Sequence, residues 1–140
     1  MDEKMLEIRE YHGEGYKPLV DYGEWRVAIL RYLDELQPEH IDQMERHTET
    51  DEVFVLLCGQ GLLILGGIGE EVEDIYPQPM EYGTLYNVKR NAWHTALLSR
   101  DASVLLVENN DTGDQNSEYA RLSTDHRRLI VEQARQYPFD

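Results

Sequence analysis

The sequence predicts an all-β protein: a barrel or sandwich of short strands with one short helix near the C-terminal end. Short apolar or alternating stretches recur along the 140 residues, and turn-forming residues separate them. No helical pattern of about 10 to 15 residues lies between these stretches, which disfavours a parallel sheet with crossover helices. A chain of this length buries most of the surface that its unfolded form exposes, so we expect one domain over residues 1–140.

The N-terminal third predicts one clear strand. Residues 1–11 alternate weakly and indicate a short strand or arm, whereas residues 12–23 are rich in Gly, Lys, Pro and Asp and indicate a loop. Residues 25–33 alternate apolar side chains and predict a strand. On this strand Arg26 is expected to project into solvent, with an anionic ligand as the alternative partner. Residues 34–42 contain a proline and predict a turn.

The middle of the chain predicts a β-hairpin. Two unbroken apolar runs, residues 53–58 and 62–65, flank the short break Gly59-Gln60-Gly61. Residues 70–76 predict a further strand that ends at the prolines after it. The remaining expected strands are residues 84–88, 93–99 and 103–108, and a polar loop is expected at residues 109–117.

The only helical pattern lies at residues 123–137. Ser or Thr at its start can cap the first turn, and Ile130, Ala134 and Tyr137 form a stripe at spacings i, i+4 and i+7. This stripe predicts a helix that packs one face against the strands.

Composition limits the function classes. The net charge of −15 argues against nucleic acid and anionic membranes as partners, because both require a basic surface. No apolar stretch approaches the length that spans a bilayer, and the charged N-terminus shows no apolar signal-peptide region. We therefore expect a cytoplasmic protein.

A cluster of ionisable residues precedes the first apolar run. Glu45, His47 and Glu49 recur at period two, so in an extended segment they leave the same face, and Asp51 and Glu52 follow directly. A divalent cation is one partner that lets such groups share a small buried volume. The alternative is a solvated strand end, because the chain carries 28 acidic residues.

His94 lies in a second apolar context, between Ala92-Trp93 and Ala96-Leu97-Leu98. A single histidine in such a strand is more often a satisfied core residue than a ligand. The acidic cluster upstream offers it a second role, as a member of a metal site.

The two segments resemble the two motifs of the cupin superfamily. The first motif corresponds to residues 45–59: His47 falls on its second histidine, Glu52 on its glutamate and Gly59 on its glycine. Glu45 occupies the place of the first histidine. The second motif corresponds to residues 83–98, where Gly83 and His94 match its glycine and histidine. The second motif's proline, inner glycine and asparagine are replaced by Lys89, Asn91 and Leu98.

This resemblance implies a cupin-like jelly roll that brings both motifs into the mouth of a barrel. It implies a divalent metal, with Mn, Fe, Zn or Ni the ions that suit the donors. The implied ligands are His47, Glu52, His94 and Glu45. It also implies a small-molecule ligand and a homodimer. Tyr86 and Trp93, beside the second motif, are expected to form an apolar pocket wall, with core packing as the alternative.

Three functions follow from the resemblance. The first is a metal-dependent enzyme, a dioxygenase or an isomerase, that acts on a small polar metabolite. The second is a metal-free enzyme similar to the sugar-nucleotide epimerases of the superfamily, with His94 and Glu52 as general acid and base. The third is a non-catalytic pocket that binds a small ligand.

Overall fold

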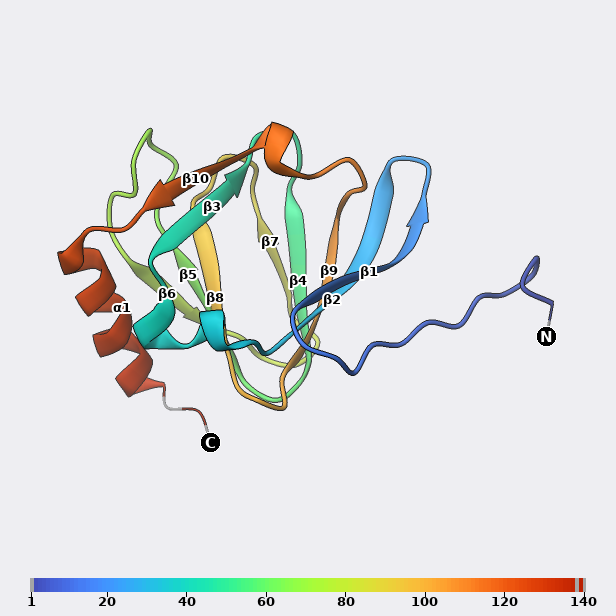
Figure 1. The fold of residues 1–140 in the computed structure, drawn as a ribbon, viewed down its shortest axis with the longest axis horizontal. Helices are drawn as coiled ribbons and strands as arrows, with labels where there is room; N and C mark the ends of the chain where they lie inside the picture. The colour runs from blue at the N-terminus through green and yellow to red at the C-terminus, as the bar shows by residue number, and fades with distance from the viewer. Residues whose placement is uncertain (1, 138, 140) are drawn as a thin grey trace.

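The computed structural model describes residues 2–137 and 139, and within this part of the chain ten strands form two five-stranded antiparallel sheets (Figure 1). The first sheet has the strand order β1 (Tyr16–Tyr22), β2 (Trp25–Arg31), β9 (Ser103–Asn109), β4 (Glu52–Cys58) and β7 (Leu85–Val88). The second has the order β10 (Ser117–Arg121), β3 (Gln43–His47), β8 (His94–Leu98), β5 (Gly61–Leu65) and β6 (Tyr76–Pro79). The predicted all-β class with a short C-terminal helix is confirmed.

The two sheets face each other across the main apolar core. Alternate residues of β4 point inward, so Phe54 and Leu56 are buried while Val53 and Val55 lie on the outer face and are half-buried. The same alternation places Val104 and Leu106 of β9 in the core, and β2 contributes Ala28. Further core residues come from the second sheet: Leu63, Ala96 and Leu98.

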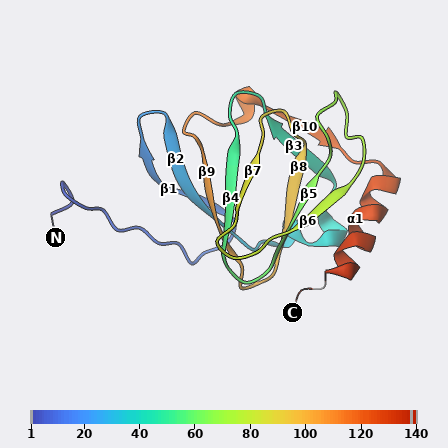
Figure 2. The same cartoon turned by 180° about the vertical axis from the view of Figure 1, so that it is seen from behind.

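A second apolar cluster lies between the second sheet and the helix α1 (Thr124–Gln136). Ser123 caps α1, since its hydroxyl oxygen accepts a hydrogen bond from the backbone N–H of His126. Ile130 of the predicted stripe is fully buried against this sheet. Figure 2 shows α1 beside the second sheet, on the far side from β1 and β2. Across the described residues, no helix combines the length and apolarity that crossing a bilayer requires.

The first sheet has no such cover on its outer face within the described residues. Val55 of β4 and Leu85 of β7 pair across this face, and Leu85 is 69% exposed. Residues 2–11 form no strand and extend away from the sheets as an arm (Figures 1 and 2). Of the two alternatives for this segment, the arm is confirmed.

The predicted β-hairpin is wrong. β4 pairs with β7 and β9 in the first sheet, whereas β5 pairs with β6 and β8 in the second, so the glycine turn carries the chain from one sheet to the other. Gly59 has φ of 74°, and a Cβ there would lie 2.5 Å from the Cα of Ala102. Two apolar runs joined by a tight turn are compatible with both arrangements, because each strand is central in its own sheet.

Other boundaries also differ from the prediction. β1 lies within the expected loop 12–23, because pairing with β2 outweighs the local turn composition. The strand expected at residues 70–76 begins instead at Tyr76 and includes two prolines, which an edge position tolerates. β10 was not expected, and its pairing with β3 makes it the opposite edge of the same sheet.

Candidate metal centre

A cavity of about 700 Å³ opens between the two sheets. Ionisable side chains from four strands meet in it: Glu45 and His47 from β3, His94 from β8, Glu52 from β4 and Glu108 from β9. Apolar side chains complete much of its wall, namely Leu30, Leu36, Ile41, Phe54, Ala96 and Leu106. The cavity therefore has a charged region inside a largely apolar frame.

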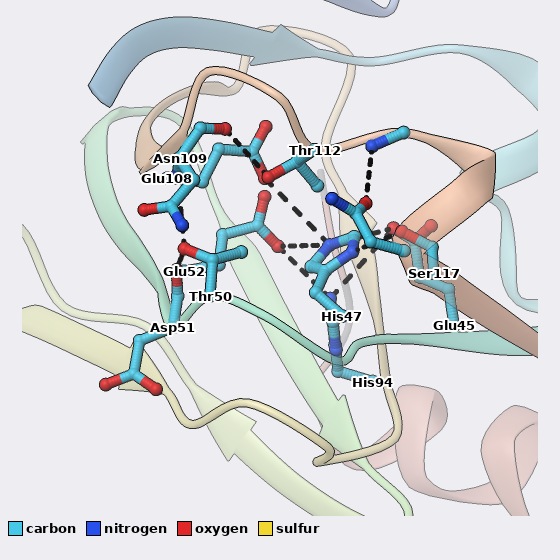
Figure 3. Close-up of polar contacts among 12 residues, drawn as sticks. Glu45, His47, Thr50, Asp51, Glu52, His94, Glu108, Asn109, Thr112 and Ser117 are labelled. Carbon is cyan, nitrogen blue, oxygen red and sulfur yellow. Dashed lines mark hydrogen bonds and ion pairs between the residues drawn. The ribbon is translucent and has the colours of Figure 1, made fainter. Parts of the chain in front are cut away.

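Strand register brings the donors together. Glu45 of β3 lies directly opposite His94 of β8, which places residues of both predicted motifs on one face of the second sheet. Glu52 begins β4 and points inward on the same face as Phe54. Figure 3 shows the carboxylates of Glu45, Glu52 and Glu108 around the imidazole of His47.

The distances among these groups are short. Glu52 Oε1 lies 3.1 Å from His94 Nε2 and 3.3 Å from His47 Nε2. Glu45 Oε1 lies 4.0 Å from each of the two Nε2 atoms. Glu52 and the two histidines are buried, whereas the Glu45 side chain is 41% exposed.

The protonation of His94 follows from its backbone contact. Its Nδ1 lies 2.9 Å from the carbonyl oxygen of Ala92, and because a carbonyl only accepts, Nδ1 carries the hydrogen. In the neutral ring Nε2 then presents a lone pair to Glu52 Oε1, which is also an acceptor. A proton or a metal cation between these two atoms resolves the conflict.

The second histidine of the site, His47, also has a ring nitrogen close to the Glu52 carboxylate. Its Nδ1 contacts Ser117 Oγ at 2.8 Å, but its Nε2 is the one buried side-chain nitrogen or oxygen among the described residues that has no hydrogen-bond partner. The nearby Glu52 oxygen approaches without hydrogen-bond geometry. Nε2 is therefore available to a ligand in the cavity.

Glu108 is a member of the site that the sequence analysis missed. Its Oε1 accepts hydrogen bonds from the hydroxyl of Tyr16 at 2.8 Å and from Arg26 Nη2 at 2.9 Å, and its Oε2 lies 3.9 Å from His47 Nε2. A signal was present, because Glu108 continues the buried alternation of Val104 and Leu106. A charged residue on the core face of a strand indicates a site.

Arg26 does not project into solvent as expected. Its side chain is only 17% exposed, and its guanidinium donates to Glu108 and to the carbonyl oxygens of Asn110 and Thr112. The predicted alternation of β2 is right, but the face with Arg26, Ala28 and Leu30 is the inner one.

Burial and the neighbouring charges shift the pKa values of the site. Burial lowers the pKa of both His47 and His94, but the adjacent Glu52 carboxylate outweighs it, so both pKa values are raised. Burial raises the pKa of Glu52, yet the two imidazoles hold it below its ordinary range. Burial and the charge of Glu52 raise the pKa of Glu108 to about 7.

The donor set fits a divalent transition metal. Metal bonds to imidazole nitrogen and carboxylate oxygen measure about 2.0 to 2.2 Å, so two donors of one ion lie at most about 4.2 Å apart. The contacts given above, from 3.1 to 4.0 Å, fall within that limit. Two overlapping groups qualify as ligand sets: Glu45, His47 and His94, and His47, Glu52 and Glu108.

The comparisons with known proteins identify the fold. Family models and curated protein sequences give no match to this sequence. Among solved structures, a cupin-2 domain containing protein from Shewanella frigidimarina NCIMB 400 superposes with a TM-score of 0.52 at 11% identity, over 71% of this chain and 85% of that one. The chain has the cupin fold.

Other cupin-fold structures carry different chemistry. A Streptomyces PAC13 variant with uridine gives a TM-score of 0.56 at 15% identity, over 82% of this chain and 85% of that one. Pac13 is described as a nucleoside dehydratase. HppE in its Fe(II) form gives 0.51 at 13% identity, over 67% of this chain and 48% of that one. These likenesses show the fold, and the chemistry of the site has to be argued from its side chains.

Two residues expected on the pocket wall, both in the described part of the chain, do not line this cavity. The hydroxyl of Tyr86 donates to the carbonyl oxygen of Pro79, and its ring packs against the core between the sheets. Trp93 is buried on the α1 side of the second sheet, where its Nε1 donates to the carbonyl oxygen of Gly69. Both are core residues here, which corrects the prediction.

Of the three residues that recur at period two, Glu45, His47 and Glu49, only the first two belong to strand β3. β3 ends at His47, so Glu49 lies beyond the strand, is exposed, and accepts a hydrogen bond from Asn116 at 3.3 Å. Asp51 points away from the two histidines (Figure 3). Lys89 and Asn87 hold its carboxylate, and Lys89 is the main cause that lowers the pKa of Asp51 to about 2.

Proposed function

We propose that this chain binds one divalent transition metal in the cavity and uses it in a reaction of a small polar metabolite. The observation that carries the proposal is that two buried imidazole nitrogens face one carboxylate oxygen. The Nε2 atoms of His47 and His94 both lie within 3.3 Å of Glu52 Oε1. A cation shared by the three groups satisfies all of them at once.

In this proposal His47, His94 and Glu52 hold the ion. Ser117 and the carbonyl oxygen of Ala92 fix the two rings through their Nδ1 atoms, the arrangement that orients metal-bound histidines in other sites. Glu45, the fourth residue of the predicted set, stands at the more exposed side. Mn, Fe, Zn and Ni suit this mixture of imidazole and carboxylate donors.

A metal at this position supplies Lewis acidity or, if it is redox-active, dioxygen chemistry. The residues of the cavity determine what is bound there. Two imidazoles and one carboxylate leave room on the ion for a ligand, and apolar side chains form part of the wall around it. An isomerase and a dioxygenase are the two reaction types that we propose.

The charge of the cavity restricts the metabolite. Arg26 is the only lysine or arginine among the described lining residues, and Glu108 already pairs with it. The carboxylates on the wall number six: Glu35, Asp42, Glu45, Glu52, Glu108 and Asp114. This balance disfavours a ligand with a free phosphate and supports a neutral polar one.

The test is elemental analysis of protein purified without chelator, for the wild type and for His47→Ala. We expect about one equivalent of Mn, Fe, Zn or Ni in the wild type and a loss of it in the variant. His12→Ala is the matched control because His12 is exposed and does not line the cavity. A metal-free wild type after reconstitution, or equal loss in the control, would contradict the proposal.

A second candidate is a metal-free enzyme in which His94 and Glu52 exchange a proton with the ligand. Their direct contact of 3.1 Å supports it, because an imidazolium with a carboxylate is an acid–base pair. The cupin-fold neighbour that carries uridine and is described as a nucleoside dehydratase makes a neutral nucleoside the first ligand to test. Uridine turnover in excess chelator, abolished in Glu52→Gln and kept in Asp51→Asn, would favour this candidate. Uridine binding without turnover would favour a ligand-binding protein.

A further inference from the structure

We infer that Glu108, rather than Glu45, is the fourth protein ligand of the metal. This inference rests on the proposed metal-binding function and changes its ligand set. The sequence analysis predicted Glu45 as a ligand because it occupies the position of the first histidine of the first motif. Glu108 is separated from that motif by 49 residues or more and reaches the site because β9 lies between β2 and β4 in the first sheet.

The carboxylates of Glu108 and Glu45 differ in burial more than in their distance from His47. Glu108 Oε2 lies 3.9 Å from His47 Nε2 and Glu45 Oε1 lies 4.0 Å from it, so the two are equally near this nitrogen. Glu45 is also near His94, whereas Glu108 is near Glu52. The Glu108 side chain is 3% exposed, however, while that of Glu45 is 41% exposed. Water can solvate the charge of Glu45, but the charge of Glu108 needs a partner inside the protein.

Arg26 and Tyr16 contact only one of the two carboxylate oxygens of Glu108. Arg26 and Tyr16 both bond its Oε1, which leaves Oε2 on the side of His47. Glu52, a second buried carboxylate, stands beside it: ligand atoms of Glu108, Glu52 and His47 all lie within 4.8 Å of one another. Arg26 pairs with Glu108, and Glu52 has the imidazoles of His47 and His94 beside it. A divalent ion between the two carboxylates adds the positive charge that lets both imidazoles bind as neutral rings.

The contacts of Oε1 also prepare Glu108 for this role. A carboxylate held at one oxygen by two side chains keeps its other oxygen in place, so little side-chain freedom is lost when that oxygen binds an ion. No hydrogen bond from another described residue restrains the Glu45 carboxylate in this way. Arg26 and Tyr16 are thus positioning residues of the site.

The test compares two isosteric substitutions in one site, Glu108→Gln and Glu45→Gln, by titration with Co²⁺ and Mn²⁺ against a competing fluorescent chelator. We expect Glu108→Gln to raise the dissociation constant at least about 10-fold, as loss of a ligand does. We expect Glu45→Gln to raise it about fivefold or less, as loss of an exposed nearby charge does. Glu49→Gln, outside the cavity, is the control and should leave it unchanged.

Two further measurements distinguish a change in metal coordination from a general loss of folding. The visible spectrum of bound Co²⁺ responds to the number of ligands, so it should change in Glu108→Gln and stay in Glu45→Gln. Tyr16→Phe removes one hydrogen bond to Glu108 from a largely exposed strand and should weaken Co²⁺ binding severalfold, without change in its stoichiometry.

The result that would overturn the inference is the opposite order, with Glu45→Gln the damaging change and Glu108→Gln silent. Equal effects of the two would overturn it as well. If the wild type binds one equivalent and Glu108→Gln binds as tightly, only this inference fails. If the wild type binds neither ion, the proposed function fails together with it.

Discussion

Replacing Arg26 by methionine should destabilise the protein in a way that depends on pH. The substitution keeps an apolar stem of similar length but leaves the buried Glu108 carboxylate without its cation. Removing one partner of a buried ion pair costs about 3 to 5 kcal/mol. Because Tyr16 still donates to Glu108, and because Glu108 can take up a proton instead, we expect about 2 to 4 kcal/mol at pH 8.5.

At lower pH the loss should shrink. The pKa of Glu108 is raised to about 7, so at pH 6 the wild-type carboxyl is already largely neutral and depends less on Arg26. We expect a destabilisation of about 1 to 2 kcal/mol there. The measurement is urea unfolding in the presence of chelator, followed by tryptophan fluorescence, to which the buried Trp93 and the exposed Trp25 both contribute.

Arg31→Met is the matched control for this experiment. Arg31 ends the same strand, and its guanidinium donates to the carbonyl oxygen of Gly13 at an exposed position. Its replacement should cost less than about 1 kcal/mol at either pH. The reasoning is refuted if Arg26→Met costs no more than Arg31→Met, or if its cost is the same at pH 6 and pH 8.5.

Three more predictions concern the wild type, the site and the outer face. With chelator present, stability should fall as pH rises from 5 to 8, because folded Glu108 keeps its proton up to about pH 7 while the unfolded chain releases it near 4.5; a stability that rises over this range in urea unfolding would contradict the burial argument. Ser117→Ala should weaken Co²⁺ binding about 10-fold by freeing the His47 ring, with stoichiometry kept, and unchanged affinity in chelator competition would exclude this role. The expected homodimer stays a prediction: light scattering should give twice the chain mass, and Leu85→Lys on the exposed sheet face should halve it, whereas a wild-type monomer would end this expectation.

The fold could be predicted because its main signals are local. Short strands with turn residues between them, and one helical stripe with a capping residue, specify an all-β chain without knowledge of the pairing. The hairpin prediction failed because pairing is not local. The runs before and after Gly59 read alike whether they pair with each other or with β9 and β8.

The site could be predicted in part for the same reason. His47 and Glu52 are near each other in the sequence, and the family pattern joined them to His94. Glu108 was missed and Arg26 was assigned to solvent because each sits in an ordinary alternating strand, where the buried face has to be chosen. For β2 the face with Trp25 looked more apolar, but the inner face is the one with Arg26, which Glu108 neutralises.

The four inferred ligands, His47, His94, Glu52 and Glu108, are shared equally between the sheets, and this affects the order of events in folding. His47 and His94 belong to the second sheet, while Glu52 and Glu108 belong to the first. The complete set exists only after both sheets have formed and closed on each other, which is a late and long-range event. A bound ion would therefore link the two sheets only in the folded protein. It would slow the rate of unfolding and leave the rate of folding unchanged.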